Sequence, residues 1–416
     1  MTFKDVKLFL HKTLWGGIVV KKIIVGFMVV ILIFLGVGCA NSCSEESREE
    51  EPPIQRTFEK RRLNIVDIDE DQFETIIQLG IMGNKYYYVI SEMMQENDEF
   101  IDAGVWSFYE YNLDTDENIF IGKIEYVHAN SAVNAFLNDG KIVMTISIVD
   151  EEFGRVNNHY LIDVNERKIE IIHTDTEPGT HVIMNFAVND SQFITRLLWP
   201  IGEATDEWIF RYEILLGNSD GDIQTIIEMA QEPYTGMGSQ ILAASTYRGQ
   251  IHTLETRETG NDDDIIIYFV IYDLDGVELS RQVVPGAAYD FVTSGFPIWE
   301  YYVFGDYIYL SNGNNRSGLL LKRTSSGYEK IEQLSGQQML FLAPSTYIRE
   351  GKNEFIFYQW GFENQKFYRL FADSGRIERI NFDSEGARGA VYNDNRLVIY
   401  RELDYQFAGI YYVKFN

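Results

Sequence analysis

Oxygen-bearing side chains at alternate positions are the first feature of this sequence that suggests chemistry. They occur in four short stretches: Asp67, Asp69 and Asp71; Asp114, Asp116 and Asn118; Asp220 and Asp222; and Asp262 to Asp264. Alternating oxygen donors of this kind suit Ca²⁺. No stretch has the glycine and distal glutamate of a full EF-hand loop, and Asp, Asn and Gly are also the usual residues of tight turns. The sequence therefore predicts no required cofactor, with Ca²⁺ as the alternative.

Aromatic residues near acidic segments form a second candidate site. The predicted ligand-binding residues are Trp106, Trp199, Trp208, Tyr234 and Trp360. The acidic segments are Glu96 to Asp102, Asp150 to Glu152, Ile201 to Glu207 and Thr256 to Asp264. Aromatic rings beside carboxylates suit sugars, cationic groups or a peptide strand. The competing interpretation is that the tryptophans cap the core and that the acids are solvated.

The common catalytic patterns are missing from the sequence. Its six histidines, at positions 11, 128, 159, 173, 181 and 252, form no His-Glu-x-x-His motif and neighbour no cysteine pair. No Gly-x-Ser-x-Gly nucleophile motif is present, and the sequence ends in a predicted strand, so we expect no hydrolase domain after it. We therefore predict no catalytic residue and no metal ligand.

A repeated turn shows how the chain is organised. A tight turn followed by a strong strand recurs seven times, at Gly83-Asn-Lys85, Asp139-Gly-Lys141, Asp190-Ser-Gln192, Arg248-Gly-Gln250, Phe304-Gly-Asp306, Glu350-Gly-Lys352 and Asp394-Asn-Arg396. The intervals are 44 to 58 residues, which fits four-stranded propeller blades with loops. Each of the first six units also contains a second hairpin, such as Tyr109 to Ile124.

These repeats predict an all-β, seven-bladed β-propeller with closure between its N- and C-terminal strands. The seventh unit has one strand too few, and the spare segment Arg62 to Ile68 has a suitable length and alternation to pair with Ile410 to Phe415. In such a ring the longer connections share one face, so we expect the acidic segments and the aromatic residues to gather there.

The N-terminal segment predicts export. Lys21 and Lys22 precede sixteen uncharged residues, Ile23 to Gly38, which suffice for a signal peptide but are short for a membrane span. The following cysteine gives Leu35-Gly-Val-Gly-Cys39, which resembles a bacterial lipobox, although Gly36 stands where that pattern prefers leucine. The resemblance implies cleavage before Cys39 and its lipidation. An uncleaved anchor is the alternative, and translation starting near Val19 or Val20 would explain the long leader.

We accordingly divide the chain into a signal peptide (residues 1–38), a flexible acidic tether (39–61) and the propeller (62–416). The protein is expected outside the cytoplasm, anchored to the bacterial cell membrane by its lipid. Both of its cysteines, Cys39 and Cys43, lie in the tether, so no disulfide is expected in the propeller. The net charge of −28 argues against binding to nucleic acid and, if the partner is charged, favours a cationic one.

Over residues 63–416 the chain resembles secreted bacterial propeller lipoproteins in architecture, without the repeat signatures of WD40, kelch or quinoprotein propellers. The resemblance implies a fold and transfers no catalytic residue. The expected function is binding or scaffolding at the cell envelope through one face of the propeller, with a cationic, glycan or peptide ligand. The alternatives are a lactonase- or glycosidase-like hydrolase, using a metal or paired carboxylates at the channel mouth, and a structural component of a larger envelope complex.

Overall fold

The computed structural model describes residues 59–65, 75–96, 99–127, 131–137, 140–150, 154–175, 181–201, 209–230, 240–258, 265–294, 298–312, 317–343, 348, 351–359, 366–380, 387–403 and 406–415. The chain divides into two compact units, Met1–Ile54 and Gln55–Asn416. All the described residues belong to the second unit. Cys39, the signal peptide and most of the tether lie outside them.

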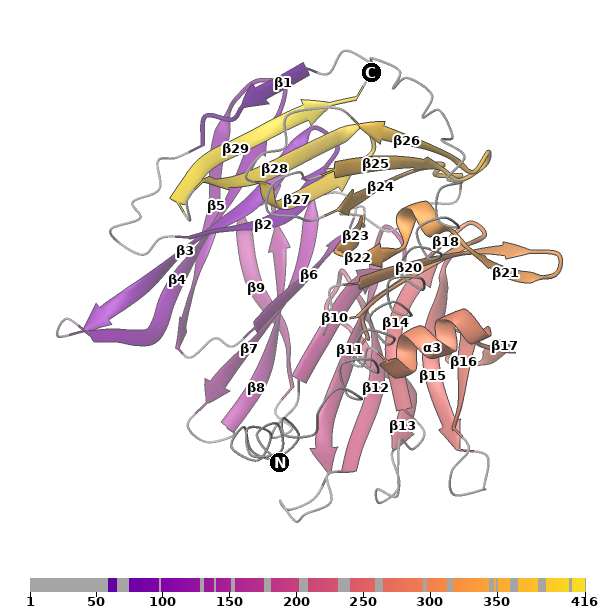
Figure 1. Ribbon diagram of the computed structural model, residues 1–416. Coiled ribbons are helices and arrows are strands. Elements are labelled where there is room, and N and C mark those ends of the chain that lie inside the picture. Colours follow the sequence, from indigo (N-terminus) through magenta and orange to yellow (C-terminus); the bar gives the residue numbers. More distant parts are fainter. Residues whose placement is uncertain are drawn as a thin grey trace, which may run out of the picture. The chain divides into compact units, whose positions relative to one another are not determined.

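The described residues form seven antiparallel sheets in sequence order, which confirms the predicted seven-bladed β-propeller (Figure 1). Blade 1 contains β2 (Thr75–Met82), β3 (Lys85–Glu96), β4 (Glu99–Asn112) and β5 (Asn118–Val127). Blade 2 contains β6 (Ser131–Leu137), β7 (Lys141–Asp150), β8 (Gly154–Asp163) and β9 (Lys168–Asp175). Blade 3 contains β10 (His181–Ala187), β11 (Gln192–Ile201), β12 (Ile209–Asn218) and β13 (Ile223–Ala230).

The remaining blades follow the same order. Blade 4 contains β14 (Gln240–Tyr247), β15 (Gln250–Glu258), β16 (Ile265–Tyr272) and β17 (Glu278–Val283). Blade 5 contains β18 (Ile298–Phe304), β19 (Tyr307–Asn312), β20 (Ser317–Thr324) and β21 (Gly327–Lys330), and β22 (Gly336–Gln337) pairs with β20. Blade 6 contains β23 (Met339–Leu342), β24 (Glu354–Gln359), β25 (Lys366–Phe371) and β26 (Arg376–Ile380). Blade 7 contains β27 (Ala387–Asn393), β28 (Arg396–Leu403), β29 (Gln406–Lys414) and β1 (Glu59–Arg62).

The innermost strands hold the ring together. The first strands of neighbouring blades contact one another, and β2 meets β27, while blades 5 and 6 meet through β20 and β23. The second strands are covered by a blade on either side, so apolar residues of one strand can be buried on both of its faces. In β3, Tyr86 and Tyr88 pack toward blade 7, whereas Tyr87 and Val89 pack toward blade 2. This explains why the sequence reads as runs of apolar residues rather than as alternation.

The blades have two different ends. At one end, tight turns join the first strand to the second and the third to the fourth, as predicted, except in blade 6, where residues 343–353 separate β23 from β24. Arg248 and Gly249, with φ of 54° and 68°, turn the chain between β14 and β15 in the manner of a type I′ hairpin. We call this the tight-turn end. The opposite end, which carries the second-to-third connections and the passages between blades, is the long-connection end.

The described residues include one α-helix, α3 (Gly286–Ser294), and a short 3₁₀ turn, η2 (Glu332–Leu334), both in passages between blades. The sequence pattern did not predict α3. It buries Ala288 and Val292 against the core between blades 4 and 5. Neither helix of the described part has the length and apolarity required to span a membrane.

The ring closes as predicted in kind, but through residues further toward the N-terminus. β1 pairs antiparallel with β29 from Glu59 opposite Lys414 to Arg62 opposite Tyr411, and the Leu63 amide donates to Ile410 O at 2.8 Å. The predicted strand, Arg62 to Ile68, was placed too late because its apolar alternation was taken as the strand signal. The closing strand is the outermost one, so it can be charged, while Leu63 is buried in the cluster between blades 7 and 1.

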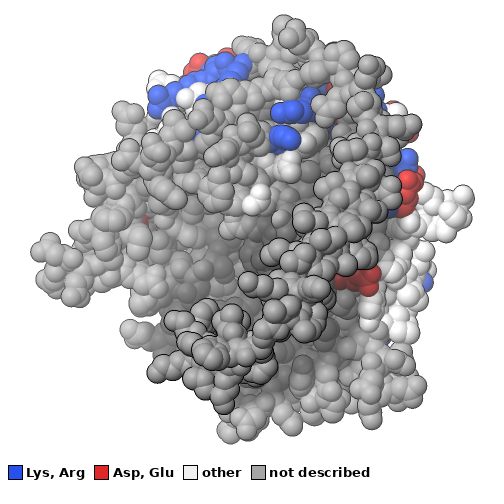
Figure 2. Space-filling view, viewed as in Figure 1, with Lys and Arg blue, Asp and Glu red and all other residues white. Residues whose placement is uncertain are grey.

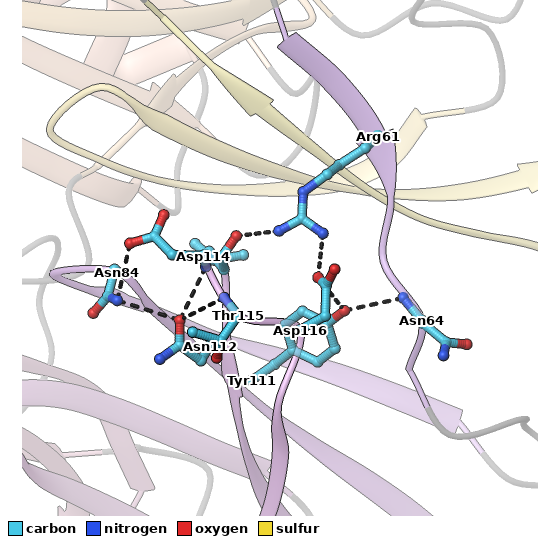
Figure 3. Close-up of polar contacts among 9 residues, drawn as sticks. Arg61, Asn64, Asn84, Tyr111, Asn112, Asp114, Thr115 and Asp116 are labelled. Atoms are coloured by element: carbon cyan, nitrogen blue, oxygen red, sulfur yellow. Dashed lines mark hydrogen bonds and ion pairs between the residues drawn. The ribbon is translucent and has the colours of Figure 1, made fainter.

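A polar cluster fastens this closure at the tight-turn end (Figure 3). The Arg61 guanidinium donates to the carboxylate of Asp116 and to the carbonyl of Leu113, both in the β4–β5 turn of blade 1. Tyr111 donates to Asp116 at 2.8 Å and accepts from the Asn64 amide at 3.2 Å. The cluster therefore joins blade 7 to blade 1, and we call these five residues, Arg61, Asn64, Tyr111, Leu113 and Asp116, the closure latch.

Side-chain hydrogen bonds of Asn112 and Asn84 stabilise the β4–β5 turn that binds Arg61. Asn112 Oδ1 accepts the amides of Asp114 and Thr115 at 2.9 and 3.2 Å, and Asn84 donates to both Asn112 and Asp114.

Figure 2 shows Lys and Arg atoms gathered at the top of the molecule, where Figure 1 places β1 and β29. In a strongly acidic protein, this closing strand is thus a local basic edge.

Candidate functional site

The predicted aromatic site is described only in part. Trp106 lies within β4 with 6% of its surface exposed, packed with Phe108, Ile142 and Met144 between blades 1 and 2. Trp199 lies near the long-connection end of β11, with its backbone opposite Arg211, and its side chain is outside the described set. Trp208, Tyr234 and Trp360 also fall outside the described residues. The ligand-binding role of these five residues remains a prediction. The Trp106 side chain is buried in the core between blades 1 and 2.

One predicted loop is a strand hairpin instead. Apart from Asn97 and Asp98, which are not described, the segment Glu96 to Asp102 continues β3 and β4. The prediction of a loop is wrong because acidic residues favour a loop only where a strand would bury them, whereas a hairpin that extends beyond the neighbouring blades can carry charges in its strands. Figure 1 shows these two strands projecting from the rest of blade 1.

The predicted calcium motifs that are described serve as turns. Asp116 accepts from Arg61 and Tyr111, and Asn118 bonds to Tyr88. Asn218 Oδ1 accepts the amides of Asp220 and Asp222. Among the described residues no group of three His, Cys, Asp or Glu side chains is placed to hold a metal ion.

Two aromatic contacts link the first strands of blades 3, 5 and 6. Phe186 of β10 packs edge-on against Tyr302 of β18, with ring centroids 5.6 Å apart, and Tyr302 packs against Phe341 of β23 at 5.0 Å. Blades 3 and 5 are not neighbours, since blade 4 stands between them, so the contact of Phe186 with Tyr302 passes on the inner side of blade 4. We call Phe186, Tyr302 and Phe341 the axial floor.

Glu300 lies beside this floor. It precedes Tyr302 by two residues on the innermost strand β18, toward the long-connection end where that strand begins. Its carboxylate accepts from the Ser311 hydroxyl at 3.0 Å, and part of the residue's surface remains accessible. Burial raises the pKa of Glu300 to about 7, opposed in part by the Ser311 hydrogen bond. The pKa values of Tyr302 and Tyr309 are raised as well, first by burial and then by the charge of Glu300.

The environment of Glu300 differs from that of a structural carboxylate such as Glu255 in blade 4. Glu255 is fully buried, and Thr253 and Tyr272 donate to its Oε1 at 2.6 and 2.7 Å. Its Oε2 accepts from Arg257 at 2.6 and 3.0 Å. Glu300 has one hydroxyl donor among the described residues and no cation. A carboxyl with a perturbed pKa and few partners is a candidate functional group.

Another buried polar cluster lies between blades 2 and 3. Asn185 accepts from Thr195 at 2.8 Å and donates to Thr145 at 2.9 Å, and Thr145 Oγ1 lies 2.9 Å from His159 Nδ1. Burial, followed by the nearby His173, lowers the pKa of His159 to about 3, so the ring is neutral at physiological pH. This chain of contacts links four strands and holds the His159 ring through its Nδ1 atom.

One feature of the sequence indicates Glu300, although it belongs to none of the motifs described above. It is the one carboxylate in the otherwise apolar and aromatic first strand Ile298–Phe304. A lone charge in such a run is costly to bury unless it is paired or used. Its position near the axis follows from the meeting of non-neighbouring strands, which sequence periodicity does not show.

Comparisons with known proteins support the fold alone. The β-propeller domain of the Trilobed protease from Pyrococcus furiosus is similar at a TM-score of 0.50 and 13% identity, over 80% of this chain and 91% of that one. That domain has an open velcro topology, whereas β1 and β29 close the ring here. The acylaminoacyl peptidase of Pyrococcus horikoshii is similar at a TM-score of 0.53 and 11% identity. The match covers 83% of this chain and 52% of the peptidase, so it spans about half of that enzyme. No protein-family model matches the chain, and no curated protein matches it.

Proposed function

We propose that this propeller is a recognition module that binds a ligand bearing a cationic group at the centre of its ring, through Glu300 and the axial floor. The observation that carries the proposal is a partly buried carboxylate on an innermost strand beside aromatic rings, which has one hydroxyl donor and no cation among the described residues. A cationic group would supply the missing counter-charge, and aromatic faces attract cations. The acidic net charge would steer such a ligand toward the protein.

Four derivatives of one peptide test this proposal. Triglycine amide carries an amine, N-acetyltriglycine carries a carboxylate, triglycine carries both, and N-acetyltriglycine amide carries neither. We expect calorimetry to detect tighter binding of triglycine amide than of the uncharged peptide, and Glu300→Gln to remove the difference. Glu329→Gln, on the exposed part of β21, is the control for loss of one charge. Equal binding of the two peptides by the wild-type protein would contradict the proposal.

The pH dependence provides a second readout. Because Glu300 must be ionised to pair with a cation, affinity for triglycine amide should rise as the pH rises through about 7, the pKa of Glu300 in the free protein. Binding at pH 7 should also release a fraction of a proton, measurable by calorimetry in buffers of different ionisation enthalpy. Both effects should disappear in Glu300→Gln.

We also propose that the module works outside the cytoplasm, anchored to the bacterial membrane through lipid on Cys39. The lysine pair, the apolar run and the small residues before Cys39 support this. Stable attachment requires at least two acyl chains, as a bacterial lipoprotein has. A labelled fatty acid should appear on the wild-type protein and not on Cys39→Ser. Equal labelling of both proteins would reject Cys39 as the site.

A hydrolase at the same place is the second candidate. A carboxyl with a pKa of about 7 can act as a general acid at neutral pH, and the two similar propellers described above belong to peptidases. Chromogenic glycosides, lactones and peptides should then be turned over by the wild-type protein and not by Glu300→Gln. Stoichiometric binding without turnover favours the recognition module, and co-purification of an envelope protein would instead favour scaffolding.

A further inference from the structure

Arg196 is a buried arginine that has no acidic partner in the described part of the chain. It lies in the middle of β11, with 4% of its surface exposed, on the face of blade 3 that packs against blade 4. Its guanidinium donates to the carbonyl of Ile241, near the start of the innermost strand β14, and lies 6.0 Å from the ring of Tyr212. Its Nε atom has no hydrogen-bond acceptor in the described structure.

No carboxylate of the described residues around Arg196 pairs with it. Glu213, the carboxylate next to Tyr212 in sequence, lies on the opposite face of β12 and pairs with Arg211 at 2.5 Å. Glu255 lies on the facing side of blade 4, but both of its oxygens are used by Thr253, Tyr272 and Arg257, as described above. Burial lowers the pKa of Arg196 to about 10, so the guanidinium is still charged at neutral pH.

A buried charge without a partner lowers stability, and replacing such groups with apolar ones is often stabilising. Arg196 is therefore costly for the fold as it stands. A guanidinium has five N–H donors arranged to bind a planar carboxylate through two hydrogen bonds. The side chains beside it are polar as well, since the Tyr212 hydroxyl donates to Gln240 at 2.7 Å near the same strand start.

We propose that Arg196 anchors a binding subsite between blades 3 and 4 that takes a carboxylate group of a ligand. Tyr212 and Gln240 border this subsite. The carboxylate could be that of a uronic acid sugar or the C-terminus of a peptide, which share the same planar group. The proposal does not depend on Glu300, because it concerns the opposite charge on a different blade.

The experiment compares two carboxylate probes with their uncharged counterparts at constant ionic strength. N-acetyltriglycine and glucuronate are tested against N-acetyltriglycine amide and glucose, by thermal denaturation and by calorimetry. We expect at least one of the two carboxylates to raise the melting temperature of the wild-type protein. We expect Arg196→Met to bind that carboxylate with at least tenfold lower affinity. The tighter of the two probes identifies the source of the carboxylate. If neither probe binds, or if both bind Arg196→Met as well as they bind the wild-type protein, the proposal is wrong.

Stability distinguishes this role from a structural one. Arg196→Met should melt no lower than the wild-type protein, because it removes an uncompensated charge and keeps most of the side-chain volume. Arg257→Met is the matched control in blade 4 and should melt lower, because it leaves the buried Glu255 without its cation. If Arg196→Met loses stability as Arg257→Met does or fails to fold, the guanidinium is structural. Arg196→Lys keeps the charge and should retain weaker carboxylate binding, which a purely structural loss would not predict.

The two proposals fail separately. Loss of the difference between triglycine amide and the uncharged peptide would remove the role of Glu300 and leave Arg196 untouched. Loss of the response to N-acetyltriglycine and glucuronate would do the reverse. Triglycine, which carries both charges, should bind more tightly than either singly charged peptide if one ligand can reach both groups.

Discussion

The closure latch and the centre of the ring use charged residues in opposite ways. In the latch, Arg61 and Asp116 are partly exposed, with 27% and 53% of their side-chain surfaces accessible, and each has at least two partners. Among the described residues, Glu300 beside the axial floor has one hydroxyl donor, and Arg196 between blades 3 and 4 has one backbone acceptor. The first arrangement stabilises the fold, whereas the second is unfavourable for it.

This difference separates structural charges from candidate functional ones better than residue type does. Breaking a satisfied ion pair removes a contact that holds two blades together. Removing an unpaired buried charge relieves a desolvation penalty. The two regions should therefore respond to substitution with opposite signs, and each prediction below examines this contrast, from the largest expected effect to the smallest.

Removing the closing strand should have the largest effect. A chain that begins at Leu63 lacks β1 and leaves the edge of β29 unpaired, so it should lose cooperative unfolding and aggregate. A chain that begins at Gln55 keeps β1 and should melt like the full-length protein. Circular dichroism melts and light scattering of both chains test this. Identical melts would mean that β1 contributes nothing to closure.

The boundaries of β1 show where sequence reasoning succeeds and where it stops. Seven tight turns at regular intervals were enough to predict the blade number and the need for an N-terminal strand. The pattern placed that strand at Arg62 to Ile68, because alternation indicates a strand with one buried face, whereas the real outermost strand contains Lys60, Arg61 and Arg62. The motifs of the sequence did not indicate Glu300 and Arg196, because what distinguishes them is the lack of an oppositely charged neighbour among the described residues. That feature is visible only in the folded structure.

Trp106→Ala should cost about 3–5 kcal/mol, the usual range for removing a buried tryptophan from a core. The side chain packs between blades 1 and 2, away from both of the unpaired charges. Urea denaturation measures the loss, and peptide binding by the fraction that remains folded should be unchanged. If the variant keeps its stability and loses triglycine amide binding, Trp106 is a ligand-binding residue and its assignment to the core is wrong.

Glu300→Gln should stabilise the protein, and only at higher pH. Since the folded-state pKa of about 7 lies above the ordinary value for glutamate, the protonated form is the one the fold prefers. The penalty is absent below about pH 4, grows as the pH rises from the unfolded-state pKa of about 4.5 to the folded-state pKa of about 7, and levels off at about 3 kcal/mol above pH 8, at about 1.4 kcal/mol for each pKa unit. Melting temperatures at pH 4 and pH 8.5 should show the gain at pH 8.5 alone. Glu255→Gln, which breaks a satisfied buried pair, should instead lose stability at pH 8.5.

Arg61→Ala should have the smallest effect on stability. Unlike Glu300→Gln, which should stabilise the protein at higher pH, it should destabilise the protein there. The hydrogen bond and charge of Arg61 hold the pKa of Asp116 below its ordinary value, so the ionised carboxylate stabilises the fold above the unfolded-state pKa. This contribution is lost as the pH falls through the lowered folded-state pKa. Because the pair is partly exposed, we expect a loss of about 1 kcal/mol at pH 7 and almost none at pH 2. Arg62→Ala, on the same strand but exposed, is the control and should change little. A double-mutant cycle with Asp116→Ala isolates the pair, and a coupling energy that is zero at pH 7 would show that this pair contributes nothing to the contact between blades 7 and 1, which would then rest on the apolar cluster around Leu63.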